Sequence, residues 1–323
     1  MEVTDSSIGT IGEKGTKSQG VAQISTVFGP FESSGRIYIM ENPSGTNTTV
    51  SAFGFADEVI KFDQRHPLYR ARMSRLAAAI DLAFTRIQPT TTPEEKFVYF
   101  YGTLVAEDFM EIYLVAVNGY GAAATKLLRS MYEHTVTLRY LHDHPDEVGA
   151  FIEYNRVQEY KLMQPILDTF GADALPPETI AEVKRKYEEV KEQFMVTDCK
   201  KCGTKKVNHT WSKLHFAAMA KKSGVLGTVL VPGYFLPLRH AHSTFAAMTD
   251  RMKNNDGLLS FHRESQPKLA DDALRMAHNC LLMSLEIQDE RFKIAGLKAA
   301  IENCVRDWAE IWAPDAPFLK DAG

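Results

Sequence analysis

Cysteine is scarce in this sequence, with four residues among 323. Four thiols in a chain of this size do not make a disulfide-rich secreted scaffold, and they are typical of reduced thiols in the cytoplasm. The first residues, MEVTDSSIG, lack the basic and apolar segments of a secretory signal. No stretch approaches the roughly 18 consecutive apolar residues that suggest a membrane-spanning helix. We therefore expect a cytoplasmic protein with no membrane partner.

The sequence also lacks an excess of positive charge. Its formal net charge is −4 and its isoelectric point is about 6.2, so nothing attracts nucleic acid to the chain as a whole. A local basic patch remains compatible with this composition. Several catalytic motifs are missing as well, because there is no phosphate-binding glycine loop, no G-x-S-x-G and no H-E-x-x-H. Apart from the zinc considered below, the sequence indicates no cofactor.

The N-terminal segment lacks periodicity over residues 1–34. The first 34 are rich in Ser, Gly, Thr and Lys, a composition typical of disordered or loosely attached segments. Residues 36–41 (RIYIME) and 48–55 (TTVSAFGF) are β-prone and flank a turn-forming NPSGTN, a pattern that fits a small β-hairpin. We expect no second sheet-forming region downstream. The sequence predicts a largely disordered arm over 1–60 and a helical domain over 61–323.

The helical domain is predicted to be an all-α, multi-helix bundle. Helical spacing and start and stop signals predict helices at 66–87, 93–117, 121–142, 145–170, 177–194, 211–223, 238–251, 266–293 and 296–312. We interpret the ambiguous stretch 225–236 as a buried loop and 254–257 (NNDG) as a turn.

The helix expected at 121–142 carries apolar residues on both faces, which predicts a central position in the bundle. The helix before it, 93–117, begins after Thr92, a good N-cap residue, and is followed by the helix-breaking Asn118-Gly119-Tyr120-Gly121. The two helices should therefore form an antiparallel hairpin.

Folding this hairpin about residue 120 places Glu111 opposite Arg129 and Glu107 opposite Glu133. Buried charges need partners, so we expect a cluster of carboxylates that forms ion pairs with Arg129. Such a cluster fits either a buried ion-pair network that fixes the helix register or a catalytic or ligand-binding site.

Arg129 and His134 form an R-x4-H pattern. It resembles the catalytic motif of the HEPN superfamily, all-helical ribonucleases and nucleotide-binding proteins of defence and toxin–antitoxin systems. The resemblance implies a metal-independent endoribonuclease or RNA-binding protein, and a homodimer whose cleft holds the motif. Arg129 would then stabilise phosphate charge and His134 would transfer protons. A regular helix turns roughly 140° between the two residues, which also fits a His134 that only edges the core.

A wider resemblance covers roughly residues 95–250. It rests on the run L-L-R-S-M-Y-E at 127–133 and on later residues: Tyr140, Leu141, Phe151, Tyr154, Trp211, Ser212, Tyr234 and His242. Together they resemble a family of bacterial helical proteins of unknown function. This resemblance implies one cluster of Arg129, Glu133, Tyr234 and His242. With His134, it supplies the candidate catalytic residues Arg129, Glu133, His134 and His242.

A separate pattern concerns metal binding. Cys199 and Cys202 form a C-x2-C half-site for zinc, and His209 and His215 follow at H-x5-H spacing. A structural zinc held by the two cysteines and a histidine is one interpretation, and a loop with unliganded thiols is the other. The same loop carries a local basic patch that could contact phosphate, formed by Lys200, Lys201, Lys205 and Lys206.

Two functions therefore remain open. In the first, the chain is a HEPN-like protein of bacterial defence that cleaves or binds RNA. In the second, it is a non-catalytic helical interaction or sensor protein in which the Arg/Glu cluster is structural. The position of Arg129 relative to His134 and His242 distinguishes them.

Overall fold

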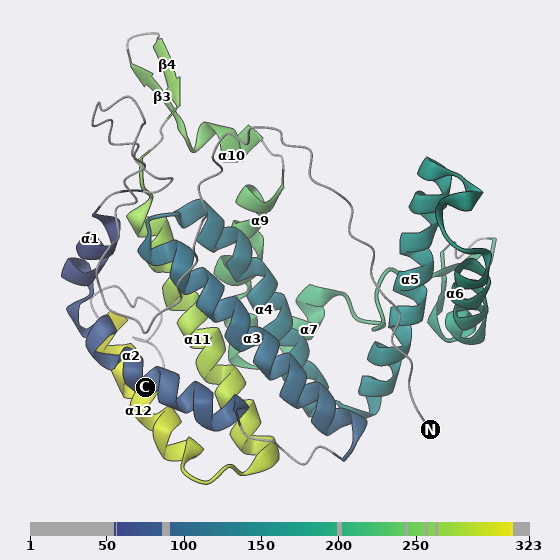
Figure 1. Cartoon of the computed structure of the whole chain (residues 1–323), viewed down its shortest axis with the longest axis horizontal. Helices are drawn as coiled ribbons and strands as arrows, with labels where there is room; N and C mark the ends of the chain where they lie inside the picture. The colour runs from purple at the N-terminus through teal and green to yellow at the C-terminus, as the bar shows by residue number, and fades with distance from the viewer. Residues whose placement is uncertain are drawn as a thin grey trace, which may run out of the picture. The chain divides into compact units, whose positions relative to one another are not determined.

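The computed structural model describes residue 55 and residues 57–85, 91–198, 202–242, 245–255, 258–261 and 264–312. The chain divides into two units, Met1–Ala52 and Phe53–Gly323, and these residues all belong to the second. The hairpin predicted within 36–55 lies outside the described residues, apart from Phe55. The described part is mainly helical from α1 (Glu58–Arg65) to α12 (Leu297–Trp312), which confirms the predicted all-α fold (Figure 1).

Three long helices form the centre of the bundle, α3 (Pro93–Val117), α4 (Gly121–Asp143) and α11 (Pro267–Phe292). Each of them packs against the other two, and α2 (Pro67–Phe84) and α12 pack together beside them (Figure 1). Their buried apolar side chains make one continuous hydrophobic core. Within the described residues, no helix is both long and apolar enough to cross a membrane.

The hairpin of α3 and α4 begins and turns as the sequence predicts. The Thr92 side chain accepts a hydrogen bond from the backbone N–H of Glu95, whose carboxylate accepts one from the N–H of Thr92. This capping box satisfies two backbone donors at the start of α3. At the other end, Gly119 adopts φ +82°, a left-handed conformation that glycine takes readily. The chain reverses there, and α4 returns along α3.

Helix α4 is buried on both faces, as predicted for a central helix. Leu128, Met131 and Leu138 are buried on the predicted core face, and Tyr132 and Val136 are buried on the opposite face. One face meets the other long helices, while the second faces the segment after α6. This second face positions the candidate site.

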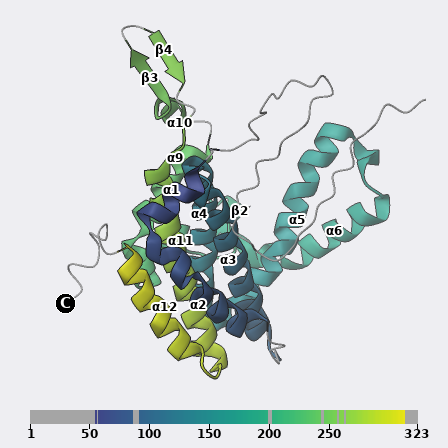
Figure 2. The ribbon, with the colours of Figure 1, turned by 60° about the vertical axis from the view of Figure 1, so that its left-hand side comes forward.

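Helices α5 (Val148–Phe170) and α6 (Pro177–Val190) pack against each other as a second hairpin. Figure 2 shows this pair projecting from the three central helices. It has a small core of its own, formed by Tyr154, Val157, Val190 and Phe194.

The remaining elements are short. They are η1 (Pro145–Glu147), η2 (Ala172–Ala174), η3 (Lys191–Phe194), β1 (Met195–Thr197), β2 (Lys205–Val207), α7 (Phe216–Lys222), α8 (Val225–Thr228), the π-helical turn η4 (Val231–Phe235), α9 (Leu236–Ala241), α10 (Phe245–Thr249), β3 (Met252–Asn255) and β4 (Leu258–Phe261).

Three predictions about these short elements are wrong. The helix expected at 238–251 is interrupted, because His242 after α9 has an extended backbone with φ −108° and ψ 159°. The stretch 225–236, expected as a buried loop, forms helical turns. The expected absence of a downstream sheet also fails, since β1 pairs with β2 and β3 with β4. Strands of three or four residues are too short for the alternation that identifies a strand in a sequence.

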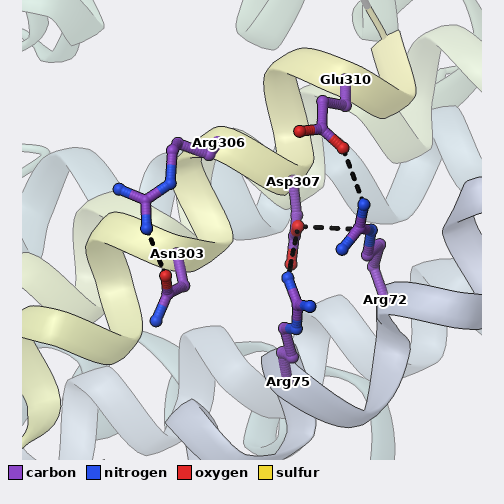
Figure 3. Close-up of polar contacts among 6 residues, drawn as sticks. All are labelled: Arg72, Arg75, Asn303, Arg306, Asp307 and Glu310. Carbon is purple, nitrogen blue, oxygen red and sulfur yellow. Dashed lines mark hydrogen bonds and ion pairs between the residues drawn. The ribbon is translucent and has the colours of Figure 1, made fainter.

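An ion-pair network joins α12 to α2 (Figure 3). The buried carboxylate of Asp307 on α12 lies 3.0 Å from Arg75 Nη1 and 3.4 Å from Arg72 Nε, and Arg72 Nη2 also lies 2.9 Å from Glu310. A buried carboxylate needs such partners because water does not solvate it. The network therefore supports the packing of the last described helix.

His278 on α11 lies in the core next to α12. Its Nδ1 accepts a long hydrogen bond from Trp312 Nε1 at 3.4 Å. Burial lowers the pKa of His278 to about 3. The imidazole is therefore neutral in the native protein at neutral pH.

We predict that His278 makes the protein less stable as the pH is lowered. An unfolded histidine has a pKa of about 6.5. Burial lowers the pKa of native His278 to about 3. Between these values the unfolded state holds more protons, so the free energy of unfolding falls with falling pH. The contribution of His278 should fall by about 2 kcal/mol from pH 7 to pH 5.

Urea unfolding of the wild type and of His278→Gln at both pH values measures this contribution. Between pH 7 and pH 5 the free energy of unfolding should fall by about 2 kcal/mol less in the variant than in the wild type. This difference does not depend on how stable the variant is at pH 7. The same pH dependence in the two proteins would contradict the assignment.

Candidate functional site

Arg129 lies on the second face of α4, with 21 % of its side chain exposed. Its Nε donates to Glu133 Oε1 at 2.9 Å, one helical turn further along. Spacing of i, i+4 brings an arginine and a glutamate together on a helix surface. Glu133 is 40 % exposed, so this ion pair is only partly buried.

His242 reaches the same guanidinium from the end of α9. Arg129 Nη1 and His242 Nε2 are 3.0 Å apart. Because a guanidinium has only donors, Nε2 must be the acceptor in this contact. The contact therefore assigns His242 as a neutral imidazole that carries its proton on Nδ1.

Tyr234 completes the surroundings of Arg129. The guanidinium carbon lies 4.9 Å from the centre of the Tyr234 ring, within the range of a cation–π contact. The ring in turn packs on Phe216 of α7, with ring centres 4.6 Å apart. We refer to Arg129, Glu133, Tyr234 and His242 as the Arg129 cluster.

The π-helical turn η4 places Tyr234 because the chain at Gly233 lies directly on α4. A Cβ atom at Gly233 would be 2.5 Å from Tyr132 Cδ2, which is closer than real contacts allow. The hydroxyl of Tyr132 also donates to the carbonyl of Leu226 at 2.6 Å. These two contacts hold the chain of α8 and η4 against α4. Single π-helical turns are frequent at functional sites.

The structure thus brings together the four residues of the predicted Arg129 cluster. Arg129 on α4 and His242 at the end of α9 are 113 residues apart in the sequence, and the fold places the two helices side by side (Figure 1). The predicted partners on α3 are wrong, however. Glu107 and Glu111 are exposed, and the hydrogen bonds of Arg129 go to Glu133 and His242 instead.

His134, the other half of the R-x4-H pattern, does not join the Arg129 cluster. Its Nδ1 lies 2.6 Å from Asp108 Oδ2 on α3, and its ring meets Tyr101 edge-on with centres 5.6 Å apart. Burial raises the pKa of Tyr101 to about 12, helped by the nearby charges of Asp108 and Glu133. The rotation of roughly 140° between Arg129 and His134 accounts for their separate partners.

Asp108 is a residue that the sequence analysis missed as a partner. The hairpin folded about residue 120 pairs Glu107 with Glu133, whereas folding about residue 121 pairs Asp108 with His134. A register estimate from the turn alone cannot decide between these alternatives, because either centre lies within the break between the helices.

Several positive groups surround His240, which lies two residues before His242. Burial lowers the pKa of His240, Asp250 opposes this effect, and Arg239, Arg251 and Lys126 lower the pKa further. Lys126 lies on α4 one turn before Arg129 and is exposed. Lys126, Arg239 and Arg251 therefore add positive charge near the Arg129 cluster, and Asp250 balances part of it through its ion pair with Arg239 at 2.9 Å.

The predicted zinc site stays a prediction. Cys199 lies outside the described residues, and Cys202 Sγ lies 2.8 Å from the Thr204 hydroxyl. The Nδ1 of His215 accepts from the backbone N–H of Ala218 and so caps α7. Among the described residues, no group of three His, Cys, Asp or Glu side chains could hold a metal ion.

Comparison with protein families finds a match over the middle of the chain. The sequence profile of a family of unknown function, DUF5677, matches residues 105–258. This span is consistent with the predicted resemblance to an uncharacterised family, and it contains all four residues of the Arg129 cluster. Searches of curated proteins and of solved structures gave no significant match.

We predict that Gly233→Ala separates the halves of the Arg129 cluster. The added methyl group would meet the Tyr132 ring, so the η4 turn must move away from α4. Overpacking of this kind costs about 1–3 kcal/mol of folding free energy. Gly149→Ala in α5 is the matched control, since its methyl group would meet nothing within 4 Å.

Chemical denaturation of both variants gives the free energies of unfolding. The control should be neutral, or more stable by up to about 1 kcal/mol, because alanine favours a helix. Equal stabilities for Gly233→Ala and the wild type would show that Tyr132 does not fix this turn.

Proposed function

We propose that this protein is a cytoplasmic RNA-binding endoribonuclease that acts through the Arg129 cluster without a metal ion. One observation carries the proposal: Arg129 Nη1 lies 3.0 Å from His242 Nε2 in a surface cluster. An arginine binds phosphate oxygens strongly, and a neutral histidine beside it can accept a proton. The HEPN-like resemblance of the sequence points to the same chemistry, in bacterial defence and as a homodimer.

In this proposal, a phosphodiester displaces His242 as an acceptor of Arg129 hydrogen bonds. Nε2 of His242 is then available to take the proton from the ribose 2′-hydroxyl. The 2′-oxygen attacks phosphorus, the bond from phosphorus to the 5′-oxygen breaks, and the leaving oxygen takes a proton from water. The hydroxide that remains takes the proton from His242, which returns to its neutral form. The products are a 2′,3′-cyclic phosphate and a 5′-hydroxyl. Arg129 stabilises the charge that develops on the phosphate oxygens.

The other two residues hold Arg129 for this role. Glu133 accepts from Nε, which orients the guanidinium and leaves donors on both terminal nitrogens for phosphate oxygens. Tyr234 supports one side of the guanidinium. His242 thus takes the role that the R-x4-H pattern first gave to His134.

A second candidate function is a non-catalytic interaction or sensor protein. The observation that favours it is a group of exposed apolar side chains on the segment around η4, namely Val225, Val231, Phe235, Leu236, Phe245 and Met248. Exposed apolar groups of this kind often mark protein interfaces. In that case the Arg129 cluster would be structural.

The test combines stability and RNA cleavage in one set of variants. We expect Arg129→Ala to lower the free energy of unfolding by only about 1 kcal/mol, because the pair it breaks is partly exposed rather than sealed in the core. We expect His242→Asn to slow RNA cleavage by about 10²–10⁴-fold, the usual contribution of a proton-transfer group. We expect Arg129→Ala to slow it by about 10²–10³-fold, the usual cost of losing one donor that stabilises transition-state charge. Arg306→Gln, an exposed arginine on α12, is the control for lost charge.

Cleavage by the wild type should persist in EDTA and should be absent with DNA of the same sequence, which lacks the 2′-hydroxyl. Two outcomes would contradict the proposal. One is a wild type that neither binds nor cleaves RNA. The other is an Arg129→Ala variant that loses about 3 kcal/mol or more, as expected for a broken buried pair.

A further inference from the structure

An exposed aromatic ring lies next to the Arg129 cluster. Phe235 follows Tyr234 in η4 and is 46 % exposed. Its ring meets the Tyr234 ring edge-on, with centres 5.2 Å apart and planes inclined by 79°. Leu236 and Val231 beside it are exposed as well, at 51 % and 56 %. Burial in the core therefore does not account for a large aromatic side chain at this position.

The distance from Phe235 to Arg129 is short. The guanidinium carbon is 4.9 Å from the Tyr234 ring centre, and that centre is 5.2 Å from the centre of Phe235. The Phe235 ring centre therefore lies at most about 10 Å from the guanidinium carbon, a bound set by these two contacts. This span is comparable to the size of one nucleotide, from its phosphate to its base.

An exposed ring at this distance suits an unpaired base. Bases stack on aromatic side chains in single-stranded nucleic acids, and basic groups nearby follow the phosphates. In an RNA duplex the base faces are hidden in the stack, so a ring such as Phe235 has no base face to contact. Positive side chains near His240, among them the exposed Lys126, suit the negative charge of the phosphate backbone.

We propose that the substrate is single-stranded RNA, with one phosphate on Arg129 and the neighbouring base stacked on Phe235. This inference rests on the proposed function and adds the class of RNA that the site accepts. The apolar neighbours Val231 and Leu236 extend the surface on which the base lies. A protein partner on the same surface is the competing occupant, and the experiment below distinguishes it.

The test measures binding of fluorescent RNA by anisotropy at one fixed salt concentration. A single-stranded oligonucleotide should bind at least tenfold more tightly than a blunt duplex that contains the same strand. Phe235→Leu should weaken binding of the single strand by about 5–100-fold, in the range of one lost stacking contact. Binding of the duplex should stay unchanged. Phe235→Trp, which keeps a stacking surface, should retain wild-type affinity for the single strand.

Phe170→Leu, at an exposed phenylalanine at the end of α5, is the matched control and should bind like the wild type. If the wild type binds single strand and duplex equally and Phe235→Leu changes neither, this inference fails while the proposed function stands. If the wild type binds no RNA, both fail. If Phe235→Leu leaves RNA binding unchanged but dissociates a dimer in sedimentation, the surface is a protein interface and the inference is overturned.

Discussion

The contact between the backbone at Gly233 and the ring of Tyr132 determines where the Arg129 cluster forms. Tyr132 is fully buried on α4, and a side chain at position 233 would clash with its ring. Together with the hydrogen bond from the Tyr132 hydroxyl to the carbonyl of Leu226, this close approach brings Tyr234 of the η4 turn to the guanidinium of Arg129. The chain then continues through α9 to His242. The contacts of Tyr132 therefore help to bring residues that are far apart in sequence together.

The same packing explains the electrostatics of the cluster. Arg129 has a carboxylate on one side, a neutral imidazole on another and a tyrosine ring near its guanidinium carbon. Only Glu133 among these carries a negative charge, and its side chain is 40 % exposed. A buried network would balance its charges more completely, because unpaired charge is costly away from water. Arg129 can therefore bind an anion from solvent without leaving a buried carboxylate unpaired.

Much of the fold could be predicted from the sequence. The N-cap at Thr92, the break at Gly119 and the apolar positions on both faces of α4 are local signals, and each was confirmed. The association of Arg129 with Tyr234 and His242 came from a resemblance between sequences. The Asp108–His134 pair was missed because it depends on a helix register that the turn does not fix. The break at His242 and the short strands were missed because brief elements carry too little periodicity.

The hydrogen bond between Arg129 and His242 is the central claim of this account, and nitrogen-15 NMR of the imidazole tests it most directly. Spectra at pH 8, assigned with His242→Asn, report which ring nitrogen carries the proton. We predict that His242 is protonated on Nδ1 and not on Nε2 in the wild type, and that Arg129→Ala shifts the proton toward Nε2. A wild-type His242 protonated on Nε2, with no change in Arg129→Ala, would contradict the account.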